Sequence, residues 1–191
     1  MTIRIVGIGG TVNPGNTTEM ALRLAAAQAE AEGAEVTIFG GEYLGKLPHY
    51  RGTGHDAEHG VELVEAVRRA HGVIIAAPGY HGTISGLVKN ALDYLEDLAK
   101  DERPYLDGRA VGLISTAYGD QASVSTLLTL RGIVHALRGW PTPMGATIRT
   151  HHGLFSPEGE CLEEPARLQL ELVGQQTFRG ARALASLDAE K

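Results

Sequence analysis

Short runs of aliphatic residues alternate with longer amphipathic stretches along the whole chain. Residues 73–77 are all apolar, as in a parallel strand that is buried on both faces of its sheet. Similar runs lie at 3–8, 36–39, 110–114 and 142–148, and helical patterns separate them at about 17–32, 59–69, 84–98, 123–138 and 163–187. The prolines of 142–148 place that strand at an edge. This alternation predicts a doubly wound α/β fold, a five-stranded parallel sheet with helices on both faces.

Composition narrows the class of protein further. A length of 191 residues suits one domain, so residues 1–191 are expected to form a single unit. The net charge of −6 and the 5% aromatic content argue against a nucleic-acid partner. One cysteine, Cys161, excludes a disulfide framework, and the longest apolar run is too short to span a membrane. A soluble cytoplasmic domain is therefore expected.

The loop after the first strand has the composition of an anion site. Residues 9–18 leave a strand and open a helix, where free N–H groups and the helix dipole favour negative charge. The dinucleotide pattern G-x-G-x-x-G fails at Val12, and the P-loop pattern fails at Asn16, which replaces its lysine. A monophosphate suits this loop better than a triphosphate. The alternative is a tight turn, capped by Asn16 or Thr17, that binds nothing.

Two further polar loops follow the third and fourth strands. Residues 78–86 combine an aromatic ring, an imidazole and glycines, and residues 115–121 are small and polar. The carboxyl ends of parallel strands meet at one edge, so the three loops predict one ligand site there, with the long loop 40–56 nearby. Read alone, 78–86 is equally a helix entrance capped by Thr83 or Ser85.

The second of these loops carries a family resemblance. Residues 78–93, PGYHGTISGLVKNALD, resemble the signature PEYNGSIPGxxKNALD of the NAD(P)H-dependent FMN reductases. These flavodoxin-like proteins include flavin, quinone, azo-dye and chromate reductases. Segments 130–139 and 155–160 resemble the family's fourth helix and the turn before its last helix, so the likeness covers nearly the whole chain. The resemblance implies the strand order 2-1-3-4-5.

The resemblance also implies FMN as cofactor and NADPH or NADH as co-substrate. It places the phosphate on the first loop and the isoalloxazine ring between the second and third loops. The implied phosphate residues are Gly10, Thr11, Asn16, Thr17 and Thr18. The residues implied to border the ring are Pro78, Gly79, Tyr80, His81, Gly82 and Thr83, with Ser115, Thr116, Ala117, Tyr118 and Gly119 at its pyrimidine edge. Hydride transfer is the chemistry of the two cofactors, so no catalytic side chain is predicted.

Three positions depart from the family pattern. Val12 stands where an arginine is common, Gly79 where an acidic residue is common, and His81 where asparagine is common. Loss of a charge-assisted phosphate contact weakens FMN binding by about 1.5–3 kcal/mol. The sequence therefore suggests an FMN that exchanges as a substrate does.

Other readings are open at this point. A serine hydrolase is disfavoured because no G-x-S-x-G elbow exists, and the adjacent pair His151 and His152 lacks metal-ligand spacing. An electron carrier or sensor without nicotinamide turnover is the rival from another class. The acceptor is open among free FMN for a partner flavin-dependent monooxygenase, quinones, azo compounds and metal oxyanions. Arg51, Arg103 and Arg149 are candidates for a 2′-phosphate contact, and a homodimer or homotetramer is expected, with Tyr94 and Leu98 as candidate interface residues.

Overall fold

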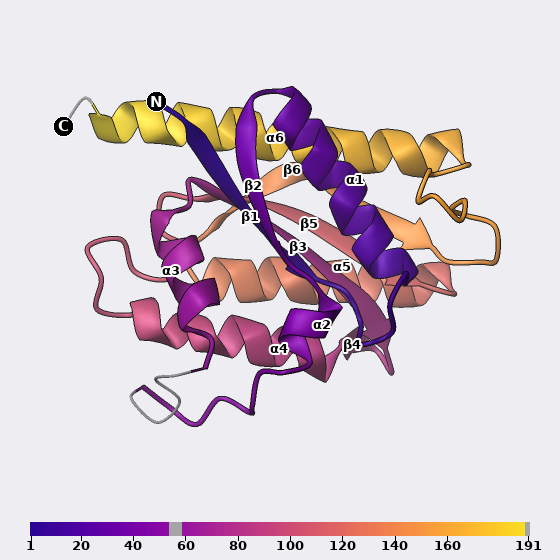
Figure 1. The fold of residues 1–191 in the computed structure, drawn as a ribbon, viewed down its shortest axis with the longest axis horizontal. Coiled ribbons are helices and arrows are strands. Elements are labelled where there is room, and N and C mark those ends of the chain that lie inside the picture. The colour runs from indigo at the N-terminus through magenta and orange to yellow at the C-terminus, as the bar shows by residue number, and fades with distance from the viewer. Residues whose placement is uncertain (54–58, 190–191) are drawn as a thin grey trace.

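The computed structural model describes residues 1–53 and 59–189 and shows a parallel sheet between two layers of helices (Figure 1). Its long strands are β1 (Ile3–Gly9), β2 (Ala34–Phe39), β3 (Gly72–Tyr80), β5 (Ala110–Ala117) and β6 (Trp140–Arg149). They lie in the order β2-β1-β3-β5-β6, and each neighbouring pair is parallel. The prolines of β6 lie in an edge strand, as the sequence predicts. The predicted flavodoxin-like α/β fold is confirmed.

The expected count of five strands is wrong by one. β4 (Thr83–Ile84) pairs antiparallel with the end of β3, so the sheet has six strands and the order 2-1-3-4-5 becomes 2-1-3-5-6 with β4 beside β3. The cause is a tight hairpin turn. His81 and Gly82 have φ values of 50° and 92°, and positive φ at both central residues is the requirement of a type I′ turn. Part of the predicted second loop is therefore strand.

The helices divide between the two faces of the sheet. α1 (Thr17–Ala31) and α6 (Glu164–Ala189) pack on one face, and Figure 1 shows them together above the strands. The other face carries α2 (Gly41–Leu44), α3 (Val61–Arg69), α4 (Gly86–Asp93), the 3₁₀ helix η1 (Tyr94–Leu98) and α5 (Asp120–Ala136). Each face has its own hydrophobic cluster. Within the described part of the chain, every helix is too short or too polar to cross a membrane.

Three segments differ from the sequence-based expectation. The predicted loop 40–56 contains the short helix α2, and its positions 54–56 lie outside the described residues. The helix expected at 59 begins at Val61, because Gly60 has a left-handed φ of 73°. The helix expected over 84–98 is α4 followed by a tighter 3₁₀ turn, in which Tyr94 and Leu98 are fully buried. Their burial assigns both residues to the core and excludes them as interface residues.

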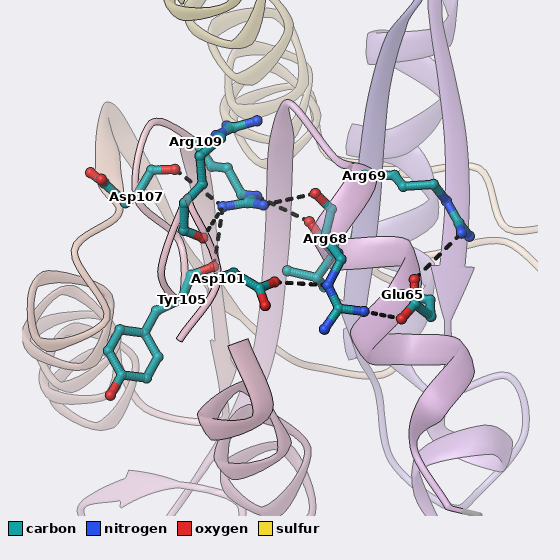
Figure 2. Close-up of polar contacts among 9 residues, drawn as sticks. Glu65, Arg68, Arg69, Asp101, Tyr105, Asp107 and Arg109 are labelled. Atoms are coloured by element: carbon teal, nitrogen blue, oxygen red, sulfur yellow. Dashed lines mark hydrogen bonds and ion pairs between the residues drawn. The ribbon is translucent and has the colours of Figure 1, made fainter. Parts of the chain in front are cut away.

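The amino-terminal edge of the sheet is held by a buried arginine (Figure 2). The Arg109 guanidinium donates to the carbonyls of Val67 and Arg68 at 3.0 and 2.9 Å, and to those of Tyr105 and Asp107 at 3.2 and 3.1 Å. Burial is the main cause that lowers the pKa of Arg109 to about 10, which leaves it charged at neutral pH. Arg109 thus fastens the end of α3 to the loop that leads into β5. This edge is opposite the predicted ligand site.

Candidate functional site

The first predicted loop is shaped by Asn16, the N-cap of α1. Its Oδ1 accepts from the N–H of Glu19 at 2.9 Å, while its Nδ2 donates to the carbonyls of Asn13 and Thr11 at 2.8 and 3.3 Å. Of the two caps that the sequence offered, Asn16 and Thr17, the structure uses Asn16. The side chain uses the N–H of the third helical residue, so the N–H groups of Thr17 and Thr18 have no intrahelical acceptor. Two donors at the positive end of a helix dipole remain for an anion.

The loop is pressed against α2, so the start of the segment 40–56 lies beside the first predicted loop. A Cβ on Gly41 would lie 1.7 Å from the Thr11 carbonyl oxygen, which leaves room there only for glycine. Glu19, which sequence reasoning missed, lies beneath this contact: its Oε2 accepts from the Gly41 N–H at 3.4 Å, and its Oε1 pairs with Arg23 at 2.7 Å. The glutamate three positions after a capping residue is the sequence signal that could have identified it.

The second loop is a β-hairpin whose tip is exposed. Pro78 is buried and pairs with Thr116 of β5, whereas Tyr80 is 51% exposed and His81, Gly82 and Thr83 are exposed. The helix behind the hairpin is capped by Ser85, whose Oγ accepts from the Val88 N–H at 3.3 Å. The hairpin therefore presents an exposed tyrosine and backbone groups at the carboxyl edge of the sheet.

The carboxyl-terminal part of the same motif, Lys89 to Asp93, makes contacts within the protein. Asn90 accepts from the Tyr50 N–H at 2.9 Å and donates to the Pro48 carbonyl at 2.9 Å, and Lys89 pairs with Asp93 at 2.5 Å. The Asn90 contacts attach the segment around Pro48 to α4, whereas the Lys89–Asp93 pair lies within that helix. The signature therefore combines an exposed hairpin with the residues that hold its support in place.

Gly79 lies where the hairpin meets α5. A Cβ there would lie 2.5 Å from the Thr126 Oγ1, so α5 occupies the space that a side chain at position 79 would use. The Thr126 hydroxyl is buried and has no hydrogen-bond partner among the residues that the structure describes. The departure of Gly79 from the family pattern thus has a packing reason.

The third loop changes from buried to exposed within three residues. Ala117 is buried, Tyr118 is 84% exposed, and Gly119 is exposed at the start of α5. A Cβ built on Gly119 would meet no described atom within 4 Å, so space is open beside it. Tyr118 and Tyr80 are large exposed aromatic side chains at one sheet edge, as a planar heterocycle requires.

Three predicted site hydroxyls are buried and bonded within the protein. Ser115 Oγ donates to the Ser123 carbonyl at 2.7 Å, and the Oγ1 atoms of Thr18 and Thr116 lie 2.6 Å apart. Thr18 and Thr116 are 3% and 2% exposed. These side chains brace the loops from behind, whereas Gly10, Thr11, Asn16 and Thr17 form the loop itself.

The histidine pair and the arginines lie as follows. His151 Nε2 is 2.9 Å from Glu163 Oε1, so His151 joins the loop after β6 to the start of α6. Within residues 1–53 and 59–189, no three His, Cys, Asp or Glu side chains gather as a metal site would require. Arg103 donates to the Gly108 carbonyl at the amino-terminal edge, away from the predicted site. Arg149 is exposed and pairs in register with Ala117 at the carboxyl edge.

The fit of these residues to FMN rests on three observations. The N–H groups of Thr17 and Thr18 have no acceptor within α1 and suit a phosphate, the exposed rings of Tyr80 and Tyr118 suit a planar ring system, and the space beside Gly119 is open. All three features lie at the carboxyl ends of β1, β3 and β5, where ligands bind in open α/β sheets.

Comparisons with known proteins agree with this geometry. The chain is 27% identical to an NADPH azoreductase of Bacillus sp. (strain OY1-2) over 173 residues, which cover 90% of this chain and 89% of that protein. It is 37% identical over 95 residues to an FMN-dependent NADPH-azoreductase of Staphylococcus aureus, which covers 50% of this chain and 46% of that protein.

Solved structures share the fold. The flavoenzyme NAD(P)H:(acceptor) oxidoreductase FerB of Paracoccus denitrificans superposes with a TM-score of 0.78 at 17% identity, covering 95% of this chain and 98% of that one. The apo form of the NADH:FMN oxidoreductase EMOB gives 0.71 at 22% identity, covering 95% and 90%. The family model described as NADPH-dependent FMN reductase matches residues 3–152. The chain therefore belongs to the NADPH-dependent FMN reductase family, whose members use FMN and a reduced nicotinamide nucleotide.

Proposed function

We propose that this protein reduces FMN with NADPH or NADH at the carboxyl edge of its sheet. The observation that carries the proposal is the meeting of a helix N-terminus with two free N–H groups and two exposed tyrosines at that edge. Residues 10–17 hold the phosphate, the hairpin 78–83 borders the ring, and residues 117–119 reach its pyrimidine edge. Thr18, Ser115 and Thr116 support these contacts from within the fold.

FMN, when bound, supplies the hydride chemistry, and the protein orients the cofactors and excludes water from them. The N–H groups of Thr17 and Thr18 anchor the phosphate, and the two tyrosines define where a planar ring lies. Backbone groups of the third loop offer hydrogen bonds to the ring edge. Hydride transfer between two cofactors that the protein brings close together would need no side-chain acid or base.

The proposal includes an FMN that exchanges with solvent. Val12 is 63% exposed and packs beside Gly45, so this position offers the phosphate no charge. The loss of an arginine contact corresponds to about 1.5–3 kcal/mol of binding free energy. Free reduced FMN then becomes a product that a partner flavin-dependent monooxygenase can use.

A second candidate keeps FMN as a prosthetic group and passes its electrons to an azo, quinone or chromate-type acceptor. The names of the two azoreductase relatives favour it. The exposed rings of Tyr80 and Tyr118 are also suited to a planar aromatic acceptor. The electron carrier without nicotinamide turnover is the third reading.

Anaerobic mixing separates these readings. The protein is mixed with an excess of free FMN and with NADPH or NADH, and the visible flavin band is followed. We expect all the FMN to be bleached. Bleaching of one bound equivalent only would favour the prosthetic group, and binding without bleaching would leave the electron carrier. Full retention of FMN after extensive dialysis would contradict the exchange.

Nucleotide choice and assembly complete the proposal. Arg149 is the arginine that we assign to a 2′-phosphate, because it is exposed beside the third loop, and Arg149→Ala should raise KM for NADPH more than for NADH.

Val124 and Leu128 form an exposed apolar strip on α5, which supports a homodimer or homotetramer. Light scattering of the purified protein tests the assembly. A cytoplasmic location is proposed because the reductant is a nicotinamide nucleotide.

A further inference from the structure

We propose that the hydroxyl pair of Thr18 and Thr116 is a strut that fixes the distance between the phosphate end and the ring end of the flavin site. The inference rests on the proposed function and adds a positioning role to it. The two Oγ1 atoms lie 2.6 Å apart, and their side chains are 98 positions apart in sequence. Both residues are almost fully buried.

The strut joins the two halves of the site directly. Thr18 is the second residue of α1, and the proposed function assigns the first N–H groups of this helix to the phosphate. Thr116 lies in β5, two residues before the exposed third loop begins at Tyr118. β3 separates β1 from β5 in the sheet, so this contact spans the central strand. It therefore links loops that no neighbouring strand pair connects.

The β5 end of the strut is itself held in place. Ser115 Oγ donates to the Ser123 carbonyl in the first turn of α5, and Thr116 pairs in register with Pro78 at the base of the hairpin. A shift of Thr116 would consequently move the second and third loops together. The strut thus sets the position of α1 relative to both loops that border the ring.

Burial argues that the two hydroxyls act on each other rather than on a ligand. Each is the partner of the other, and an unpaired hydroxyl in the interior is costly. Two methyl groups in the same place would approach only to about 3.5–4.0 Å. Replacing both threonines by valine therefore removes the polar contact and lengthens the spacing by about 1 Å.

FMN and riboflavin distinguish spacing from simple stability. FMN spans both ends of the site, whereas riboflavin has no phosphate and engages only the ring end. A change in spacing should therefore weaken FMN binding more than riboflavin binding. A loss of folding stability alone would leave the ratio of the two dissociation constants unchanged.

The test compares Thr18→Val, Thr116→Val, the double variant and the two Thr→Ser variants by flavin fluorescence quenching and thermal unfolding. Each single valine leaves one buried hydroxyl unpaired and should lower Tm, and the double valine should recover much of that Tm because its methyl groups pack together. The preference for FMN over riboflavin should fall about three- to tenfold in all three valine variants. Serine should retain the preference.

Thr177→Val is the matched control. Thr177 is fully buried on α6, and its Oγ1 donates to the Val173 carbonyl within the same helix at 2.7 Å. Its loss should lower Tm without changing the FMN preference. Two results would overturn the strut but not the proposed function. One is a double variant that recovers the preference for FMN over riboflavin together with its Tm; the other is a set of folded valine variants whose preference is unchanged. A wild-type protein that binds neither flavin would overturn the proposed function as well.

Discussion

Substitutions of Asn16 can separate its role as the N-cap of α1 from its proposed role in binding the FMN phosphate. In Asn16→Ala the cap is lost, at a cost of about 1 kcal/mol, together with two partly exposed hydrogen bonds to the loop, worth about 0.5–1 kcal/mol in total. The expected loss is about 1.5–2 kcal/mol, which lowers Tm by about 3–8 °C in a chain of this size. FMN binding should weaken as well, because the loop loses its shape.

Asn16→Asp isolates the functional part. Aspartate is as good a cap as asparagine, so the Glu19 N–H keeps its acceptor, and Tm should fall only by the roughly 1–4 °C that corresponds to the two lost loop hydrogen bonds. The carboxylate cannot donate to the loop carbonyls, and it places a negative charge beside the phosphate. FMN affinity should fall by about tenfold or more, while riboflavin affinity changes little. Asn16→Ser, which keeps the cap without the charge, is the control.

Calorimetry and flavin fluorescence titration measure both effects. An Asn16→Asp variant that binds FMN as tightly as the wild type would refute the phosphate position. An Asn16→Ala variant with unchanged Tm would refute the capping argument.

Three further predictions concern residues outside the phosphate loop. Arg109→Met should lower the free energy of unfolding by about 3–5 kcal/mol because five backbone carbonyls lose their donor. Chemical denaturation measures this loss, and a loss below about 1 kcal/mol would contradict the role drawn in Figure 2. Burial, together with the charges of Arg103, Arg4 and Arg109, lowers the pKa of His71 in the folded protein, so the unfolded chain binds a proton more readily and stability should fall as pH drops below about 6.5. His71→Asn should flatten this part of the Tm–pH curve. A curve that His71→Asn leaves unchanged would contradict the role of His71. His81→Gly should raise Tm of the flavin-free protein by about 2–4 °C by relieving a left-handed φ, and a lower Tm would show that the imidazole makes a contact that stabilises the turn.

The sequence was sufficient for the sheet because its strands are short and its central strands, β3 and β5, are largely apolar. Residues 73–77 are buried along their whole length, and the five long strands appear in the expected order. The hairpin at 78–84 was missed because its turn contains His81, which seldom adopts positive φ, in place of the usual asparagine or glycine. A glycine-rich segment before a helix was therefore interpreted as loop alone.

The sheet edge that carries the candidate site could be predicted from sequence, but the contacts of the hydroxyls there could not. Asn16, Tyr80 and Tyr118 occupy the predicted edge because they directly follow strands or open a helix. Whether Thr18 and Thr116 face a ligand or each other depends on contacts 98 positions apart, which no local pattern encodes. The burial of Tyr94 was likewise hidden, since core and interface residues share the same spacing on a helix.

Hydrogen exchange with and without FMN tests the central claim, that FMN lies across the three loops at the carboxyl edge. The account predicts slower amide exchange in residues 10–18, 78–83 and 115–119, and unchanged exchange at the amino-terminal edge in residues 101–109. Protection at 101–109 instead, or no protection of the three loops when FMN is bound, would contradict it.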